Sequence, residues 1–307
     1  MKISVGLPTS HVDHPEEWCT AAAITEMGVA VEKAGANAVF VTEHPAPDQK
    51  FMTRGGHHAL DPYVALSVVA AATTNLRLHF NLAIVAYRNP FLTAKAIATL
   101  DVVSGGRVIL GTGAGYLAPE FAALGADFDN RNDITDEAIR VMKMVWSGEP
   151  VTMEGAHFLA VDTISRPLPI QNPHPPIWIG GNSNRAMRRA VELADGWNPM
   201  PSPARASRML RTPPIESIED LAARIVDLHA ASEKAGREVA PEVIFTPIGY
   251  DLFSGEFPAA SQFVDDIGAY GAIGVSGLTI NLPGETRAEW IDRVEWLGSE
   301  ILPNIHS

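Results

Sequence analysis

The sequence predicts an α/β fold, namely a (β/α)₈ barrel with inserted segments at the C-terminal ends of its strands. Short apolar runs alternate with helical patterns along the whole chain. The runs are continuously apolar, as expected for strands that are buried on both faces. A length of 307 residues also suits one α/β barrel, so we expect a single domain over residues 1–307.

The predicted strands are short runs rich in β-branched and other apolar residues. Because a helical pattern follows each run, we expect parallel strands with the helices outside them. Eight such units favour closure into a TIM barrel, although an open doubly wound sheet remains the alternative from the pattern alone. The runs are Ile3–Leu7, Ala38–Thr42, Leu76–Val85, Val108–Gly111, Ile177–Gly180, Gly196–Pro199, Val243–Ile248 and Gly274–Ile280.

The predicted helices lie between these runs and have recognisable ends. Asp61 followed by Pro62 is typical of a helix start, and Ser217 begins a Ser-x-x-acid capping pattern. Gly35 and Gly236 are typical helix stops. The helices are expected at Ile24–Lys33, Tyr63–Ala72, Phe91–Val103, Asp133–Trp146, Asn184–Ala194, Ser217–Ala235, Phe257–Tyr270 and Arg287–Leu302.

Two segments interrupt the alternation of strands and helices. Residues Glu149–Arg166 are predicted to form a small β-hairpin around Glu154 and Gly155, and Pro199–Pro214 is predicted to be a surface loop. In a barrel, long inserts that follow strands lie at the catalytic mouth. Either segment could instead be a simple connector.

The composition excludes several classes of function. A formal net charge of −13 repels nucleic acid phosphates, so we expect no nucleic-acid partner. The single cysteine, Cys19, cannot form an intramolecular disulfide. No apolar stretch reaches the length of a membrane span, and the apolar run after Met1 is too short for a signal peptide. We therefore expect a cytoplasmic protein without membrane contact.

The sequence carries no recognisable metal or hydrolase motif. His57 and His58 are adjacent, which does not direct two ligands to one metal from a helix or strand. His-Glu-x-x-His, cysteine pairs, Gly-x-Ser-x-Gly and the Walker A motif are all absent from the sequence. We therefore expect no bound metal.

One glycine-rich turn lies between a predicted strand and a predicted helix. Gly180 and Gly181 precede Asn182 and Ser183, directly before the expected helix start. Free backbone N–H groups and the helix dipole favour an anion such as phosphate at this position. Ser183 could also be a simple N-cap, and the two roles are compatible.

A second glycine-rich turn runs from Gly111 to Gly115 after another predicted strand. Its glycines would let a flat ring or a phosphate approach the backbone near Gly113 and Ala114. The turn is not a Rossmann fingerprint, because Tyr116 occupies the position of the last glycine. A tight strand-to-helix turn without a ligand is the alternative.

Glu43 and His44 directly follow the second predicted strand. In a barrel this places a carboxylate and an imidazole at the C-terminal mouth. A histidine there could act as acid, base or hydrogen-bond donor near neutral pH. A purely structural histidine is the alternative.

The chain resembles the luciferase-like monooxygenase superfamily over roughly its whole length, most strongly from Ala38 to Pro199. Each motif is weak alone, but their combination in this order and spacing is highly specific. The matching motifs are Val-Thr-Glu-His-Pro-Ala-Pro at 41–47, Tyr-Arg-Asn-Pro at 87–90, Ala-Thr-Leu-Asp at 98–101, Ser-Gly-Gly-Arg at 104–107, Gly-Thr-Gly-Ala-Gly-Tyr at 111–116, Glu-Phe at 120–121, Leu-Gly at 124–125, Asp-Glu at 136–137, Trp146, Pro-Pro-Ile-Trp-Ile-Gly-Gly-Asn-Ser at 175–183 and Asp-Gly-Trp at 195–197.

This resemblance implies a (β/α)₈ barrel with a noncovalently held cofactor, either FMN or the deazaflavin F420. It also implies a homodimer that acts on a small-molecule substrate. In this family a non-proline cis peptide forms a bulge in the third strand and supports the middle ring of the cofactor. Here the bulge should fall at Asn81 and Leu82.

Further similarity favours F420 over FMN. The Thr-Glu-His-Pro-Ala-Pro motif at 42–47 looks like that of a group of probable F420-dependent oxidoreductases. In F420 enzymes of the superfamily, an acid meets the cofactor and the next histidine acts at the hydride-transfer centre. Glu43 and His44 match these positions, with Glu in place of the more usual Asp. Asp48 and Tyr116 stand where the sugar-phosphate dehydrogenase of this group has Trp and Glu, which argues against sugar-phosphate oxidation.

The resemblance therefore implies an F420-dependent oxidoreductase that transfers a hydride between F420 and a small organic substrate, with Glu43 and His44 as the catalytic pair. An FMN-dependent luciferase-like monooxygenase is the first alternative, and a non-catalytic F420-binding barrel is the second. A Rossmann-type nicotinamide dehydrogenase is disfavoured by the broken glycine fingerprint. The expected cofactor contacts are Asn81, Leu82, Gly113, Ala114, Tyr116, Gly180, Gly181, Asn182 and Ser183.

Overall fold

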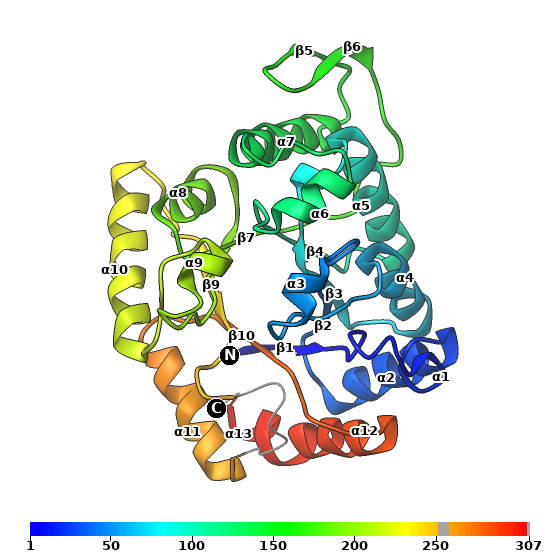
Figure 1. Ribbon diagram of the computed structural model, residues 1–307, viewed down its shortest axis with the longest axis vertical. Coiled ribbons are helices and arrows are strands. Elements are labelled where there is room, and N and C mark those ends of the chain that lie inside the picture. The colour runs from blue at the N-terminus through cyan, green and yellow to red at the C-terminus, as the bar shows by residue number, and fades with distance from the viewer. Residues whose placement is uncertain (251–257, 306–307) are drawn as a thin grey trace.

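The computed structural model describes residues 1–250 and 258–305, and its centre is a closed ring of parallel strands (Figure 1). Every predicted run overlaps one strand of this ring. The closed ring confirms the (β/α)₈ barrel and excludes the open sheet. Around the ring, the strands are β1 (Lys2–Gly6), β10 (Gly277–Ile280), β9 (Glu242–Phe245), β8 (Gly196–Asn198), β7 (Ile177–Gly180), β4 (Val108–Thr112), β3 (Arg77–Ala83) and β2 (Ala38–Val41).

The longer helices lie outside the barrel (Figure 1). Two of them begin at the predicted caps: the Asp61 carboxylate accepts the N–H groups of Tyr63 and Val64, and Ser217 forms a capping box with Asp220. The helices are α2 (Ala21–Ala34), α4 (Pro62–Ala72), α5 (Pro90–Ser104), α7 (Arg131–Trp146), α8 (Asn184–Leu193), α10 (Ile218–Lys234), α11 (Ala260–Ala272) and α12 (Arg287–Trp296).

Two predicted helices differ from the observed ones. The helix predicted at Phe257–Tyr270 is α11, which begins at Ala260, and Phe257 itself lies outside the described residues. The segment predicted as one helix at Arg287–Leu302 is α-helical only as far as Trp296, where α12 ends. It continues as a π-helical turn, η2 (Leu297–Ile301), and then as α13 (Leu302–Ile305). A π-helical turn changes the helical period locally, so a 3.6-residue pattern does not reveal it.

Several short helices were not predicted from the sequence. They lie between the longer elements. With four to six residues in the α-helical ones, they are too short to show helical periodicity. They are α1 (Pro15–Trp18), α3 (Gln49–Met52), η1 (Val85–Tyr87), α6 (Ala118–Ala123) and α9 (Ser207–Leu210).

Side chains fill the barrel interior near the N-terminal ends of the strands. Ile109, Trp178 and Ile244 pack together there as a separate buried cluster. The fully buried ring of His79 lies above them, with its centroid 4.8 Å from that of Trp178. Burial lowers the pKa of His79 to about 3, so this imidazole is neutral. His79 and Trp178 therefore close the interior beneath the C-terminal ends of the strands, and a second cavity of about 440 Å³, lined by Ile109, Trp178 and Ile244, lies at the N-terminal ends.

The two inserted segments lie in different places. The predicted hairpin is confirmed as β5 (Val151–Glu154) paired with β6 (Leu159–Thr163), but it projects beyond α7 on the outside of the barrel (Figure 1). It precedes β7, so of the two alternatives for this segment the structure shows the simple connector. The segment Pro199–Pro214 does lie at the mouth, and it includes α9, which the loop prediction missed.

Among the described residues, no helix combines the length and apolar character needed to cross a lipid bilayer. Across the same residues, there is no cluster of three or more His, Cys, Asp or Glu side chains that could hold a metal ion.

Candidate functional site

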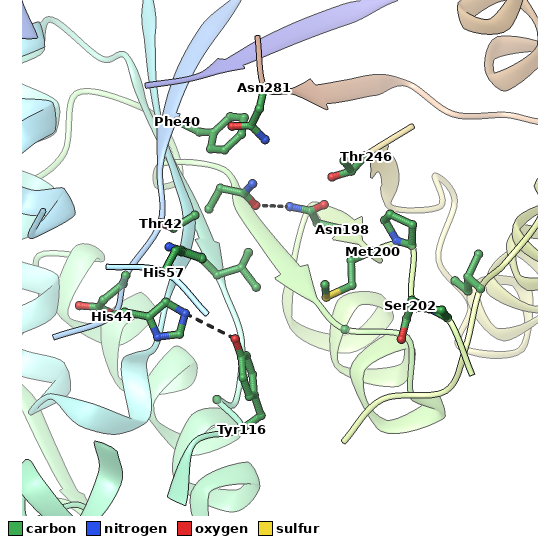
Figure 2. Close-up of a pocket in the computed structure, with 18 of the residues that line it drawn as sticks. Phe40, Thr42, His44, His57, Tyr116, Asn198, Met200, Ser202, Thr246 and Asn281 are labelled. Atoms are coloured by element: carbon green, nitrogen blue, oxygen red, sulfur yellow. Dashed lines mark hydrogen bonds between the residues drawn. The ribbon is translucent and has the colours of Figure 1, made fainter. Parts of the chain in front are cut away.

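A cavity of about 720 Å³ opens at the C-terminal ends of the barrel strands (Figure 2). This volume lies within the range of about 300–1,000 Å³ that is typical of ligand and cofactor sites. His44 and Tyr116 form one wall, and Met200 and Ser202 from the inserted loop face them across the cavity (Figure 2). The floor includes Asn81 and other residues at the ends of the barrel strands.

The bulge in β3 lies at the floor of the cavity. The peptide bond between Asn81 and Leu82 is cis, at the position expected from the family resemblance. The pairing register with β4 shifts between Phe80 and Ala83, so the strand bulges there. The Asn198 side chain donates a 2.8 Å hydrogen bond to Oδ1 of Asn81 and fixes its amide (Figure 2). Both residues of the cis peptide line the cavity.

Two of the predicted glycines make room for the bulge. A Cβ atom at Gly180 would lie 2.0 Å from Cδ1 of Leu82, and one at Gly113 would lie 3.1 Å from the same atom. At Gly113, where the sequence predicted a close approach to the backbone, the approaching group in this structure is Leu82. Of the second glycine-rich turn, Gly115 and Tyr116 line the cavity, whereas Gly113 and Ala114 are not among its described lining residues.

The turn before α8 is tied to the inserted loop. The N–H of Gly181 donates to the Asn198 carbonyl, and the N–H of Asn182 donates to the Thr212 hydroxyl. The buried Asn182 side chain donates to the carbonyls of Met200 and Pro213 and accepts from the Met200 N–H.

The Ser183 hydroxyl accepts the N–H of Ala186, so the predicted N-cap is present. Gly181 lines the cavity. Gly180, Asn182 and Ser183 are not among the described residues that line it.

Positive charge gathers around Phe128. The guanidinium groups of Arg131 and Arg211 lie over the ring of Phe128, at 4.1 Å and 4.7 Å from its centroid. Arg131 also donates to the carbonyl of Gly115, which lines the cavity. Desolvation and the nearby charge of Arg211 lower the pKa of Arg131, the charge of Asp129 opposes this effect, and the charge of Arg185 adds to it. Neither Arg131 nor Arg211 has a carboxylate at ion-pair distance among the described residues. An anion would therefore be favoured here.

His44 lies between two polar side chains on the cavity wall. Its Nδ1 is 3.4 Å from Oε2 of Glu120, and its Nε2 is 3.4 Å from the Tyr116 hydroxyl (Figure 2). Phe51 from α3 packs against the imidazole with ring centroids 4.9 Å apart. The sequence predicted His44 as a site residue but not this arrangement.

Glu120 is the main site residue that the sequence reasoning missed. It is fully buried on α6, and it accepts hydrogen bonds from the Ala46 N–H at 3.0 Å and the Tyr87 hydroxyl at 2.7 Å. Burial by itself would raise the pKa of this carboxyl, but the hydrogen bonds from His44, Tyr87 and Ala46 leave it below its ordinary value. Glu120 is therefore a buried carboxylate directed at His44.

Glu43 lines the same wall and is held by two partners. Oε2 accepts the N–H of Ile84 at 2.6 Å, and Oε1 accepts two hydrogen bonds from the Arg88 guanidinium. Arg88 also pairs with Asp61 at the start of α4. Burial raises the pKa of Glu43, and the hydrogen bonds from Ile84 and Arg88 oppose this effect. These contacts tie the end of β3 to β2 and α4.

A second histidine faces His44. The rings of His44 and His57 meet edge to face with centroids 4.9 Å apart. Nδ1 of His57 donates to the carbonyl of His58, which leaves Nε2 as the unprotonated nitrogen of a neutral ring. Burial and the neighbouring histidines lower the pKa of His57, and the hydrogen bond to the His58 carbonyl opposes this effect.

The opposite wall carries a polar group without a partner. The fully buried hydroxyl of Ser202 lines the cavity and has no hydrogen-bond partner among the described residues. A buried hydroxyl that lacks a partner is costly, and a ligand could supply one. Asn281 and Thr246 also line the cavity near its floor (Figure 2). A flat apolar ring with a polar edge would fit these lining residues. Leu82 would lie beneath the ring, and the hydroxyl and amide groups would meet its edge.

The chain also matches known proteins. An uncharacterized protein of Mycobacterium tuberculosis is 25% identical over 256 residues, covering 83% of this chain and 79% of that protein. An F420-dependent glucose-6-phosphate dehydrogenase of Microbacterium testaceum is 32% identical over 178 residues, covering 57% of this chain and 51% of that enzyme.

Among solved structures, the oxygenating constituent of 3,6-diketocamphane monooxygenase from Pseudomonas putida, in complex with FMN, has a TM-score of 0.76. It is 17% identical, and the match covers 99% of both chains. The relatives thus include F420-dependent and flavin-binding enzymes. Residues 1–246 match the family model described as luciferase-like monooxygenase. The chain therefore belongs to the luciferase-like monooxygenase family.

Proposed function

We propose that this protein is an F420-dependent oxidoreductase that transfers a hydride between F420 and a small organic substrate. The observation that carries this proposal is the imidazole of His44 at the wall of a ligand-sized cavity, next to the bulge at Leu82. The acid–histidine pair after β2 and the F420-dependent relative favour F420. An FMN-dependent monooxygenase is the second candidate, because the superposable Pseudomonas putida structure contains FMN.

The cavity has groups suited to hold such a cofactor. Asn81 and Leu82 would support the ring from below, and Tyr116, Ser202 and Asn281 would meet its polar edges. Gly113 and Ala114 would act from behind, by shaping the turn that carries Tyr116. When bound, the cofactor would accept or supply the hydride.

Two side chains on the reactive wall would act on the substrate and the ring. His44 would exchange the proton of the reacting substrate oxygen, a task suited to an imidazole near neutral pH. Glu43 would meet the cofactor edge, because a carboxylate has further acceptor sites beyond those used by Ile84 and Arg88. These polar groups at the cavity wall argue against a non-catalytic binding barrel.

The cofactor phosphate would lie at the turn formed by Gly180, Gly181, Asn182 and Ser183 at the start of α8. Several N–H groups of this turn are already used within the protein, so a second source of positive charge is needed. The guanidinium groups over Phe128 would supply it, since Arg131 contacts the carbonyl of Gly115 in the cavity wall.

Replacing Arg131 and Arg211 together by Gln should weaken binding of F420 or FMN about tenfold to a hundredfold, because two charge-assisted contacts are lost. Binding of riboflavin, which is FMN without its phosphate, should change little. Fluorescence titration measures both. Arg188→Gln, on the exposed side of α8, is the matched control and should leave both affinities unchanged. Equal weakening for riboflavin and FMN would contradict the phosphate site.

The cofactor assignment is tested by titrating the purified protein separately with F420 and with FMN. We expect saturable quenching of F420 fluorescence, and weaker binding of FMN. Tight binding of FMN without binding of F420 would replace the first proposal by the flavin monooxygenase. Failure to bind either molecule would remove both.

A further inference from the structure

We propose that Glu120, His44 and Tyr116 form a proton relay, in which Glu120 positions His44 and the Tyr116 hydroxyl passes the proton between His44 and the substrate. The proposal rests on the proposed function for its substrate step. It assigns roles to Glu120, which the sequence did not single out as a site residue, and to Tyr116, which was expected only to contact the cofactor.

Glu120 determines which ring nitrogen of His44 carries the proton. Glu120 is a carboxylate at neutral pH, because its hydrogen bonds lower the pKa of the carboxyl below its ordinary value. An ionised carboxylate only accepts hydrogen bonds, so the ring nitrogen facing it must carry the proton. Nδ1 of His44 is the nitrogen 3.4 Å from Oε2 of Glu120. Nε2 is then the unprotonated nitrogen, and it faces the Tyr116 hydroxyl.

The position of Glu120 is fixed independently of His44. The Ala46 N–H donates to Oε1, and the Tyr87 hydroxyl donates to Oε2. Ala46 lies two residues after His44, so Glu120 holds both the imidazole and the backbone of the segment that carries it. Burying a carboxylate costs free energy, and these donors offset that cost while they fix the orientation of the carboxylate toward the imidazole.

Tyr116 supplies the link to the cavity. Burial and the nearby charge of Glu120 raise the pKa of this phenol to about 12, so it keeps its proton at neutral pH. A neutral phenol can donate to Nε2 of His44 and at the same time accept from a substrate. Tyr116 lines the cavity, and its hydroxyl points toward His44 (Figure 2). Contacts of 3.4 Å are long, as is common before a ligand closes the site.

In the oxidation of an alcohol, the relay accounts for both the hydride and the proton that leave the substrate. The C–H bond breaks and its electron pair passes with the hydrogen to the bound cofactor, while the carbon–oxygen double bond forms. The substrate O–H proton passes to the Tyr116 oxygen as the phenolic proton passes to Nε2 of His44. The resulting imidazolium is stabilised by the opposite charge of Glu120. Reduction of a carbonyl runs through the same steps in reverse.

The tautomer can be measured without cofactor or substrate. In protein labelled with ¹⁵N-histidine, at a pH where the ring is neutral, the ¹⁵N signals of His44 should show a proton on Nδ1 and none on Nε2. The signals are assigned by their loss in His44→Ala. A proton on Nε2 of the wild-type protein would overturn the relay.

Two variants separate the roles of the partners. Glu120→Gln should remove the preference for the Nδ1 proton, because an amide can either donate or accept. Tyr116→Phe should keep the Nδ1 proton and move the Nε2 signal alone, since only the donor to Nε2 is lost. Glu137→Gln is the matched control: Glu137 also accepts backbone N–H groups, from His157 and Phe158, but lies outside the cavity. It should change neither signal.

The relay also has a kinetic consequence. Glu120→Gln and Tyr116→Phe should each lower turnover about tenfold or more, and Glu120→Gln should leave the affinity for F420 unchanged. Unaltered turnover in Tyr116→Phe would overturn the relay, even if Glu120→Gln proved unstable. Failure of the wild type to bind F420 or FMN would remove the proposed function, whereas the histidine signals would still decide the orientation of the ring.

Discussion

His44→Ala should lower turnover by about 10²- to 10⁴-fold and leave the affinity for F420 nearly unchanged. The imidazole lies on the wall of the cavity, whereas the floor that would support the cofactor ring is formed by Asn81 and Leu82. Removing the ring thus deletes a proton acceptor without altering the floor. Turnover is followed by the absorbance of F420 against a panel of small alcohols, ketones and enones.

His58→Ala is the matched control for this prediction. His58 is exposed and close in sequence, and its side chain is not among the described residues that line the cavity. Its carbonyl, which accepts from His57, remains in the variant. We expect wild-type turnover. A rate in His44→Ala equal to that of His58→Ala would remove His44 from the mechanism.

Gly111→Ala should lower the free energy of unfolding by about 1–3 kcal/mol or more, because overpacking inside a barrel has no space to relax. An added Cβ atom would lie 2.2 Å from the carbonyl oxygen of Phe80 and 3.0 Å from Nε2 of His79. The carbonyl belongs to the neighbouring strand and moves only if the sheet moves. Urea unfolding followed by circular dichroism measures the change in midpoint and slope.

The control for this substitution is Gly268→Ala on α11. An added Cβ atom there would meet no described atom within 4 Å. Since Ala favours a helix over Gly by about 0.5–1 kcal/mol, the stability should be unchanged or slightly higher. Similar losses in both variants would show that close packing at Gly111 is not the cause.

The fold could be predicted from the sequence because its signals are local. A strand that is buried on both faces must be apolar along its whole length, and a helix end needs a cap, as at Asp61 and Ser217. The exceptions were elements with too few residues to show a period. Both α3 and α6 are in this group, and they carry Phe51 and Glu120 to the site.

The site was less predictable because its contacts join distant parts of the chain. The order of the motifs gave His44 and the cis peptide at Asn81 and Leu82, since both belong to a family resemblance. The contact between His44 and Glu120 joins residues 76 positions apart, and no local pattern reveals it. Likewise, the buried hydroxyl of Ser202 becomes a site group only when the loop folds over the mouth.

His79 packs on Trp178 inside the barrel and separates the cavity above Leu82 from the second cavity at the N-terminal ends of the strands. Cofactor and substrate would then enter and leave this cavity through its opening at the C-terminal ends of the strands. A molecule that binds at the floor of the cavity has to bind first, and it cannot dissociate while a second molecule occupies the opening. Steady-state kinetics should therefore follow a compulsory sequence, with the last molecule to enter being the first to depart.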